Sequence, residues 1–263
     1  MSSFLLAAGV AALLVAGLVV APQGLRGQGK GQAKGQAKGG GPQAPQTPRA
    51  TAPVDLTGYW VSVVTEDWRY RMVTPTKGDF QGVPMSPEGR KIADTWDPAT
   101  AASAGDVCRS YGAPASLRVP GRLHITWQDD QTLRLDTDAG KQTRLFHFGD
   151  WKAPAGPGTL QGDSTAEWLR GGGRGGAPTG WLKVNTANLK PGLLRKNGVP
   201  YSESTTVMDY FDVIKMPNGD PLLVVTTTTT DPKYLRQPFI ITSHFKKEAS
   251  DAKWHPTECS ATW

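Results

Sequence analysis

The sequence has few residues of the types that build metal centres and nucleophilic catalytic sites. It contains two cysteines and four histidines in 263 residues, and the histidines are widely spaced. The motifs of zinc proteases (His-Glu-x-x-His), serine hydrolases (Gly-x-Ser-x-Gly) and phosphate-binding loops are absent. These absences exclude three enzyme classes in their usual form, and the sequence predicts no metal site and no cofactor.

Long apolar runs are also lacking, except for FLLAAGVAALLVAGLVV at residues 4–20. The run is long for a signal-peptide core and barely enough to span a bilayer. No cysteine follows it directly, which excludes a lipoprotein anchor. We expect residues 1–22 to be a signal peptide, or an N-terminal anchor formed by residues 4–20. The protein is then periplasmic or secreted, and possible attachment to the membrane depends on whether the run is cleaved.

Acidic residues are missing from the first fifty positions, which carry five lysines and arginines. The remainder has 24 basic and 23 acidic residues, so five of the six net positive charges come from the N-terminal segment. Its Gly-Gln-Lys-Pro composition cannot bury a core, which predicts a disordered tether over residues 23–53. The tether could contact a membrane or cell-wall polymer. The near-neutral remainder does not support nucleic-acid binding.

Helical periodicity is scarce from residue 54 onward, and apolar residues mostly alternate with polar ones. LHITWQ, TLRLDT and QTRLFHFG, separated by turn residues, predict a three-stranded meander. Four later segments continue the pattern. We expect an all-β domain over residues 54–263, an antiparallel lipocalin-like barrel or strongly curved sheet of about eight or more strands. One short helix near 87–96 and a glycine-rich loop around 152–180 interrupt it.

Several motifs in this region resemble those of a known family. DLTGYW at 55–60 is similar to the Gly-x-Trp opening of lipocalin-type barrels, in which the tryptophan closes one barrel end. CRSYGAP (108–114), GWLKVNT (180–186), Tyr201-Ser-Glu203 and DPKYLRQP (231–238) together resemble a group of exported bacterial proteins of unknown function with a lipocalin-like barrel. The resemblance implies the fold and the export, and it implies no activity.

The two cysteines, Cys108 and Cys259, match neither a zinc spacing nor a Cys-x-x-Cys redox motif. In an exported protein such a pair favours one disulfide, and two unrelated thiols are the alternative.

Residues 59–72 read as one long strand whose faces begin apolar and become polar. One face carries Arg69 and Arg71, which could together hold a carboxylate or phosphate. If Trp60 packs inside the barrel, Glu66, Trp68 and Tyr70 share its face and the arginines point outward. A β-bulge would reverse the two faces.

Two further segments carry polar groups that could form a site. In the meander, a tight turn places His124 opposite Leu135, Asp136 or Thr137, and a His–Asp pair could orient the imidazole as a base. A half-exposed histidine beside a polar strand face is the structural alternative. Thr226–Thr230 places hydroxyls on both faces of its strand, so the strand either lines a wet interior or lies at an edge.

Three function hypotheses follow. The leading one is an exported protein that binds a small, partly apolar ligand, contacted by residues of the barrel mouth. The ligand contacts would come from Trp60, Glu66, Trp68, Arg69, Tyr70, Arg71 and Trp127. The second is a barrel-mouth isomerase, dehydratase or hydrolase with His124, oriented by Asp136, or Glu66 as base. The third is a structural or assembly subunit of the cell envelope.

Overall fold

The structure is a computed structural model that describes residues 46–65, 68–103, 106–171 and 179–262. Ala44–Trp263 forms one unit of the chain. The predicted signal peptide or anchor (1–22) and most of the predicted tether (23–53) lie outside the described residues. Among those described, none of the helices is long and apolar enough to cross a membrane.

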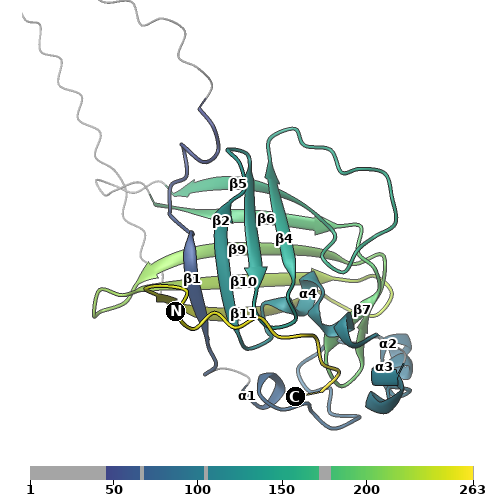
Figure 1. The fold of residues 1–263 in the computed structure, drawn as a ribbon. Helices are drawn as coiled ribbons and strands as arrows, with labels where there is room; N and C mark the ends of the chain where they lie inside the picture. Colours follow the sequence, from purple (N-terminus) through teal and green to yellow (C-terminus); the bar gives the residue numbers. More distant parts are fainter. Residues whose placement is uncertain (1–45, 66–67, 104–105, 172–178, 263) are drawn as a thin grey trace, which may run out of the picture. The chain divides into compact units, whose positions relative to one another are not determined.

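Nine described strands form a closed barrel, which confirms the predicted all-β, lipocalin-like fold. Around the barrel the strands follow the order β1-β11-β10-β9-β6-β5-β4-β3-β2 (Figure 1). Their bounds are Gly58–Val63 (β1), Arg122–Trp127 (β2), Thr132–Thr137 (β3), Thr143–Phe148 (β4), Asp163–Gly171 (β5), Thr179–Ala187 (β6), Thr206–Lys215 (β9), Pro221–Thr230 (β10) and Phe239–Glu248 (β11). The predicted meander is β2–β3–β4, paired antiparallel throughout.

One neighbouring pair departs from the antiparallel prediction, because β4 and β5 run parallel. Parallel neighbours need a crossover connection, since the chain must return to the end where it started. Here residues 149–162 make that return without a helix (Figure 1). The loop predicted around 152–180 therefore contains a strand, β5, and its residues 172–178 lie outside the described part of the chain.

The barrel interior is filled by the apolar residues of each strand's inward face, as period-two alternation dictates. Trp60, Phe146, Phe211 and Phe245 have no water-accessible surface. The core they form also includes Leu56, Leu117, Leu123, Ile125, Leu133, Leu135, Phe148, Ala166, Leu182, Val184, Leu223 and Val225. The centre of the barrel is consequently packed rather than hollow.

Short helices and a hairpin cap one end of the barrel (Figure 1). They are α1 (Trp68–Arg71), α2 (Pro87–Ala93), α3 (Pro98–Ser103), the 3-10 helix η1 (Val107–Tyr111), α4 (Ala113–Ser116), β7 (Gly192–Arg195) and β8 (Val199–Tyr201). The predicted short helix is α2, where Ser86 accepts a hydrogen bond from the Gly89 backbone N–H at 3.0 Å. A second apolar core, which includes Phe80, Tyr201 and Phe239, joins cap and barrel.

The prediction of one strand over residues 59–72 is wrong. β1 ends at Val63, and Trp68–Arg71 forms the helix α1. Beyond Val63 the alternation is carried by charged and aromatic residues, and Trp68, Arg71 and Met72 also fit a helical spacing of three and four. The pattern therefore did not distinguish the two structures, and the backbone pairing of β1 with β2 and β11 decides where the strand stops.

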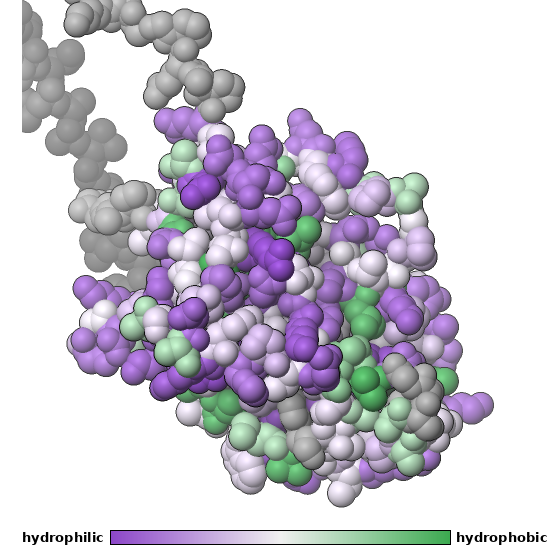
Figure 2. Space-filling model, in the orientation of Figure 1, coloured by the Kyte–Doolittle hydropathy of each residue, from purple (hydrophilic) through white to green (hydrophobic). Residues whose placement is uncertain are grey.

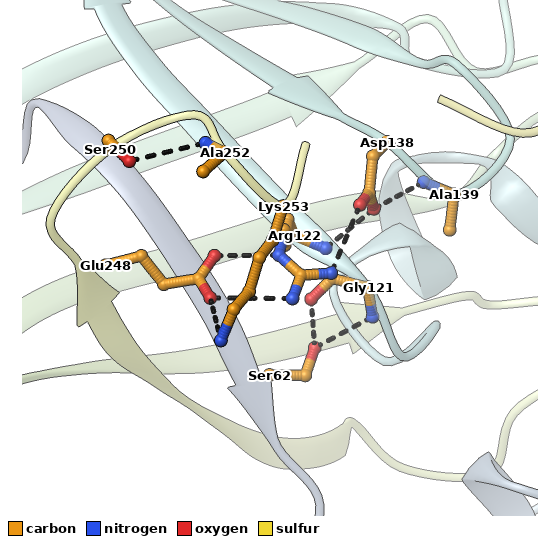
Figure 3. A network of polar contacts seen from close by, with 9 residues as sticks. All are labelled: Ser62, Gly121, Arg122, Asp138, Ala139, Glu248, Ser250, Ala252 and Lys253. Atoms are coloured by element: carbon orange, nitrogen blue, oxygen red, sulfur yellow. Dashed lines mark hydrogen bonds and ion pairs between the residues drawn. The ribbon is translucent and has the colours of Figure 1, made fainter. Parts of the chain in front are cut away.

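Closure of the barrel at β1 is reinforced by the polar network in Figure 3. Arg122 on β2 reaches Glu248 on β11, with Nε donating to Oε2 at 2.7 Å. The Asp138 carboxylate accepts the backbone N–H of Arg122 at 2.6 Å and that of Ala139 at 2.7 Å. Strands on either side of β1 are thus joined by side chains as well as by the sheet.

The C-terminal residues 249–262 run along the outside of the barrel and end at the cap. Cys259 forms the predicted disulfide with Cys108 of η1. Nearby, Lys196 donates to the Ser260 backbone carbonyl at 2.8 Å and to the Tyr111 hydroxyl at 2.9 Å. The disulfide and these hydrogen bonds fasten the end of the chain to the cap.

Residues 46–57 lie against the opposite end of the barrel. The Trp168 indole donates from Nε1 to the Pro48 carbonyl at 2.9 Å, and Arg170 donates to the Thr51 carbonyl at 2.8 Å. Val54 packs on the barrel core. The last residues of the predicted tether are therefore part of the folded unit.

Candidate functional site

Trp60 and Trp127, two of the predicted ligand contacts, both belong to the barrel end that residues 46–57 cover. Trp60 is fully buried and donates from Nε1 to the Leu56 carbonyl at 2.9 Å. Trp127 packs on Phe148 and Trp168, at ring-centroid distances of 5.6 and 6.4 Å. Trp60 is a core residue and Trp127 is partly buried against the core, so a ligand could reach Trp60 only by displacing packed side chains.

The predicted contacts on residues 66–72 do not form an arginine clamp in this structure. Arg69 pairs at the surface with Asp79, at 2.5 Å. Arg71 is buried and donates from Nε to the Arg118 carbonyl at 3.0 Å. Trp68 is 60% exposed. The two arginines lie on the short helix α1, one at the surface and one buried, and so do not share a strand face. Glu66 lies outside the described residues.

Tyr70, the remaining predicted contact, belongs to the cap helix α1. The Arg195 guanidinium lies over its ring, 4.2 Å from the centroid, and the Tyr70 hydroxyl bonds Gln81 at 3.1 Å. These contacts are of the kind that hold a helix or loop in place. A cation over an aromatic face contributes modestly to stability.

The predicted His124–Asp136 pair is opposite in register, as the tight-turn interpretation allowed. Both side chains lie on the outer wall, because Leu123 and Ile125 take the inward positions. Asp136 directs its two oxygens at Arg134, at 2.7 and 2.9 Å, while His124 stacks on Tyr59 with ring centroids 4.0 Å apart. An arginine rather than the imidazole holds the carboxylate, so the arrangement does not orient His124 as a base.

A buried ion pair inside the barrel was not foreseen from the sequence. Arg144 donates from Nη2 to Asp209 at 2.8 Å and to Thr186 at 3.1 Å, and Thr227 donates to Asp209 at 2.5 Å. The Arg144 and Asp209 side chains are 1% and 0% exposed. The pair is sealed from solvent and is therefore structural. Alternation did place Arg144 and Asp209 on inward faces, which was the available signal.

A groove of about 540 Å³, hereafter the outer groove, runs over the outside of β5, β6, β9 and β10. Apart from Thr186 and Val207, which take inward positions, its floor is made by outward side chains of these four strands, and the β4–β5 crossover forms one wall. The lining consists of Trp151, Ala153, Asp163, Thr165, Asn185, Thr186, Ala187, Asn188, Thr206, Val207, Met208, Thr228 and Thr230. The lining thus combines hydroxyl, amide and carboxylate groups with apolar side chains.

The register of the sheet explains how the floor is built. Thr165 pairs with Asn185, Asn185 with Met208, and Met208 with Thr228, which makes one row across the four strands. β10 lies between β9 and β11, so the interpretation of Thr226–Thr230 as an edge strand is wrong. A floor of central, paired strands is a rigid support for a ligand.

The wall of the outer groove is positioned by a stacked pair of rings. Trp151 stacks on His147, which projects from the outer face of β4, with centroids 4.0 Å apart and planes within 9°. Burial lowers the pKa of His147, against smaller opposing effects of Asp129 and Asp163. The imidazole is therefore neutral at neutral pH, and it offers the indole an uncharged aromatic partner.

In the orientation of Figure 1, Figure 2 shows hydrophilic residues over most of the visible surface, with apolar residues in small separate patches. Within the described ranges, no three His, Cys, Asp or Glu side chains come together as metal ligands. Comparison of the chain with protein-family models, with curated proteins and with solved structures finds no match.

Proposed function

We propose that the protein is an exported binding protein that holds a small, partly apolar ligand in the outer groove. The observation that carries this proposal is the groove itself. Its volume of about 540 Å³ lies in the range of small-molecule sites, and its lining combines apolar contact area with a few polar groups. The ligand lies outside the barrel because side chains occupy the barrel centre.

Export is supported by two separate features of the chain. The Cys108–Cys259 disulfide is of the kind that persists in oxidising compartments. The apolar run at residues 4–20 has the composition of a signal-peptide core or an anchor. The resemblance of the barrel motifs to exported bacterial proteins points the same way. A binding protein in that location would meet its ligand outside the cytoplasm.

Native mass spectrometry of the full chain, purified from the envelope of its own cells, tests the proposal. We expect an excess mass that disappears when the protein is denatured. Ala187→Trp should abolish the excess because it fills the groove, whereas Ala252→Trp, an equal change at an exposed position away from the groove, should retain it. Equal retention by both variants would place the ligand elsewhere, and a wild-type protein without excess mass would contradict a tightly held ligand.

A further inference from the structure

We infer that the outer groove takes a neutral carbohydrate. This inference rests on the proposed function and names the ligand class of the same site. It is drawn from the charge of the lining, the spacing of its polar groups and the aromatic wall.

The charge of the lining argues against an anionic ligand. Asp163 carries a carboxylate, and none of the described residues that line the outer groove carries a positive charge. A carboxylate or phosphate on the ligand would lose its water without gaining a cation and would be repelled by Asp163. Asn188 donates from Nδ2 to Asp163 Oδ2 at 2.8 Å, which holds the carboxylate in place at the groove.

The floor offers hydrogen-bonding groups at regular intervals. Thr165, Asn185 and Thr228 lie in one row across the sheet, and Thr206 pairs with Thr230 in the next. Neighbouring strands lie about 4.8 Å apart, so the groups recur at multiples of that distance. Threonine hydroxyls donate and accept, as do asparagine amides. A wholly apolar ligand would bury these groups without partners, whereas sugar hydroxyls match them in both roles.

The aromatic wall supplies the complementary apolar contact. One face of the Trp151 indole lies against His147, and the indole also lines the groove. An aromatic face is the negative part of the ring quadrupole, and it attracts the weakly positive C–H groups that a sugar ring presents on its flat side. The methyl groups of the floor threonines offer further apolar contact to the C–H face of a sugar ring. A polyol with C–H faces therefore fits both the wall and the floor.

A cationic amine is the competing ligand class, because Asp163 and Trp151 could attract a positive charge. Asp163→Asn separates the two classes. The substitution removes the charge and keeps the shape, so an amine should lose its binding while a neutral sugar should retain it within about threefold, the effect of less than one hydrogen bond.

The test uses the full chain and site-resolved NMR titrations with cellohexaose, maltohexaose and chitohexaose, and with spermidine as the amine. We expect at least one saccharide to shift the amide signals of Thr165 and Asn185. Trp151→Ala should weaken its binding about tenfold, the magnitude of one aromatic contact. Ala187→Trp should abolish binding, and the control Ala252→Trp should not change it.

The possible failures are distinguishable. If spermidine shifts the same signals, loses its binding in Asp163→Asn, and the three saccharides do not bind, the carbohydrate inference is overturned and the proposed function stands. If neither class binds and the purified protein carries no groove-dependent excess mass, the proposed function fails as well. Saccharide binding that persists in Ala187→Trp would also overturn the inference, because the site would lie elsewhere.

Discussion

The Asp231 carboxylate accepts the backbone N–H of Ser202 at 2.6 Å, which joins two motifs that are 29 residues apart in the sequence. It also accepts the Ser202 and Thr205 hydroxyls, at 3.0 and 2.9 Å, and the backbone N–H groups of Lys233 and Tyr234, at 2.8 and 3.0 Å. One buried side chain thereby fixes the turn after β10 and the segment between β8 and β9.

We expect Asp231→Asn to lower the free energy of unfolding by about 3 kcal/mol, because the amide cannot accept all five hydrogen bonds and one of its own donors would be buried without a partner. Urea denaturation would measure the change. Asp251→Asn, at an exposed position, is the matched control and should change stability by less than about 0.5 kcal/mol. Equal effects of the two substitutions would refute the role given to Asp231.

The same carboxylate predicts acid sensitivity. Burial raises the pKa of Asp231, but the hydrogen bonds from Ser202, Tyr234, Thr205 and Lys233 outweigh burial and hold it below the usual 3.8. A lowered folded-state pKa gives stability that is present above pH 3.8 and lost as the pH falls through the folded value. Acid unfolding of the wild type should therefore be steeper below pH 3.8 than that of Asp231→Asn, as monitored by circular dichroism.

The Arg144–Asp209 pair should show strong energetic coupling. Arg144→Met or Asp209→Leu alone leaves one charge buried without its partner, and we expect each to cost about 3–5 kcal/mol. The double variant removes both charges and should be destabilised by much less than the sum. A double-mutant cycle in urea measures the difference. Additive effects would show that the two charges do not stabilise each other.

Much of the barrel could be predicted from alternation, because its strands are half buried and their two faces differ in polarity. The meander β2–β3–β4 follows from period-two patterns, and a tight turn within it allowed Asp136 as one of three residues opposite His124. The burial of Trp60 was implied by the resemblance to lipocalin-type barrels. The motifs Tyr201-Ser-Glu203 and Asp231-Pro-Lys-Tyr lie apart in the sequence, and the structure brings them into contact through Ser202 and Asp231.

The outer groove could not be predicted, for two physical reasons. Its wall depends on the parallel pairing of β4 and β5, which carries Trp151 across the outside of the sheet, and local patterns do not encode whether neighbours run parallel. Its floor combines Thr165, Asn185 and Thr228, which only the sheet register brings together. The helix at Trp68–Arg71 could not be predicted for a different reason, since the strand period and the helix period both fit the same residues.

The disulfide should stabilise the fold and hold the C-terminal segment in place. Cys108→Ala/Cys259→Ala should lower the free energy of unfolding by about 2–5 kcal/mol, and limited proteolysis should then cut within residues 249–262 before the barrel opens. Lys141→Ala removes only the exposed pair with Glu258 and serves as the control, with an expected loss of less than about 1 kcal/mol. An unchanged proteolysis pattern in the cysteine variant would mean that the remaining contacts suffice.

The stack of His147 on Trp151 makes the wall of the outer groove sensitive to pH. Because burial lowers the pKa of His147, its contribution to stability is fully present above the unfolded value of 6.5 and is lost as the pH falls below 6.5 through the folded value. An NMR titration should give a midpoint below 6.5 for the His147 ring, and the Trp151 indole signal should shift with the same midpoint.

His147→Phe keeps an aromatic partner without a titrating group, so it should remove the pH dependence of the indole signal and leave the stack in place. A midpoint at or above 6.5 would show that Asp129 and Asp163 outweigh burial, and acid would then strengthen the wall instead of loosening it.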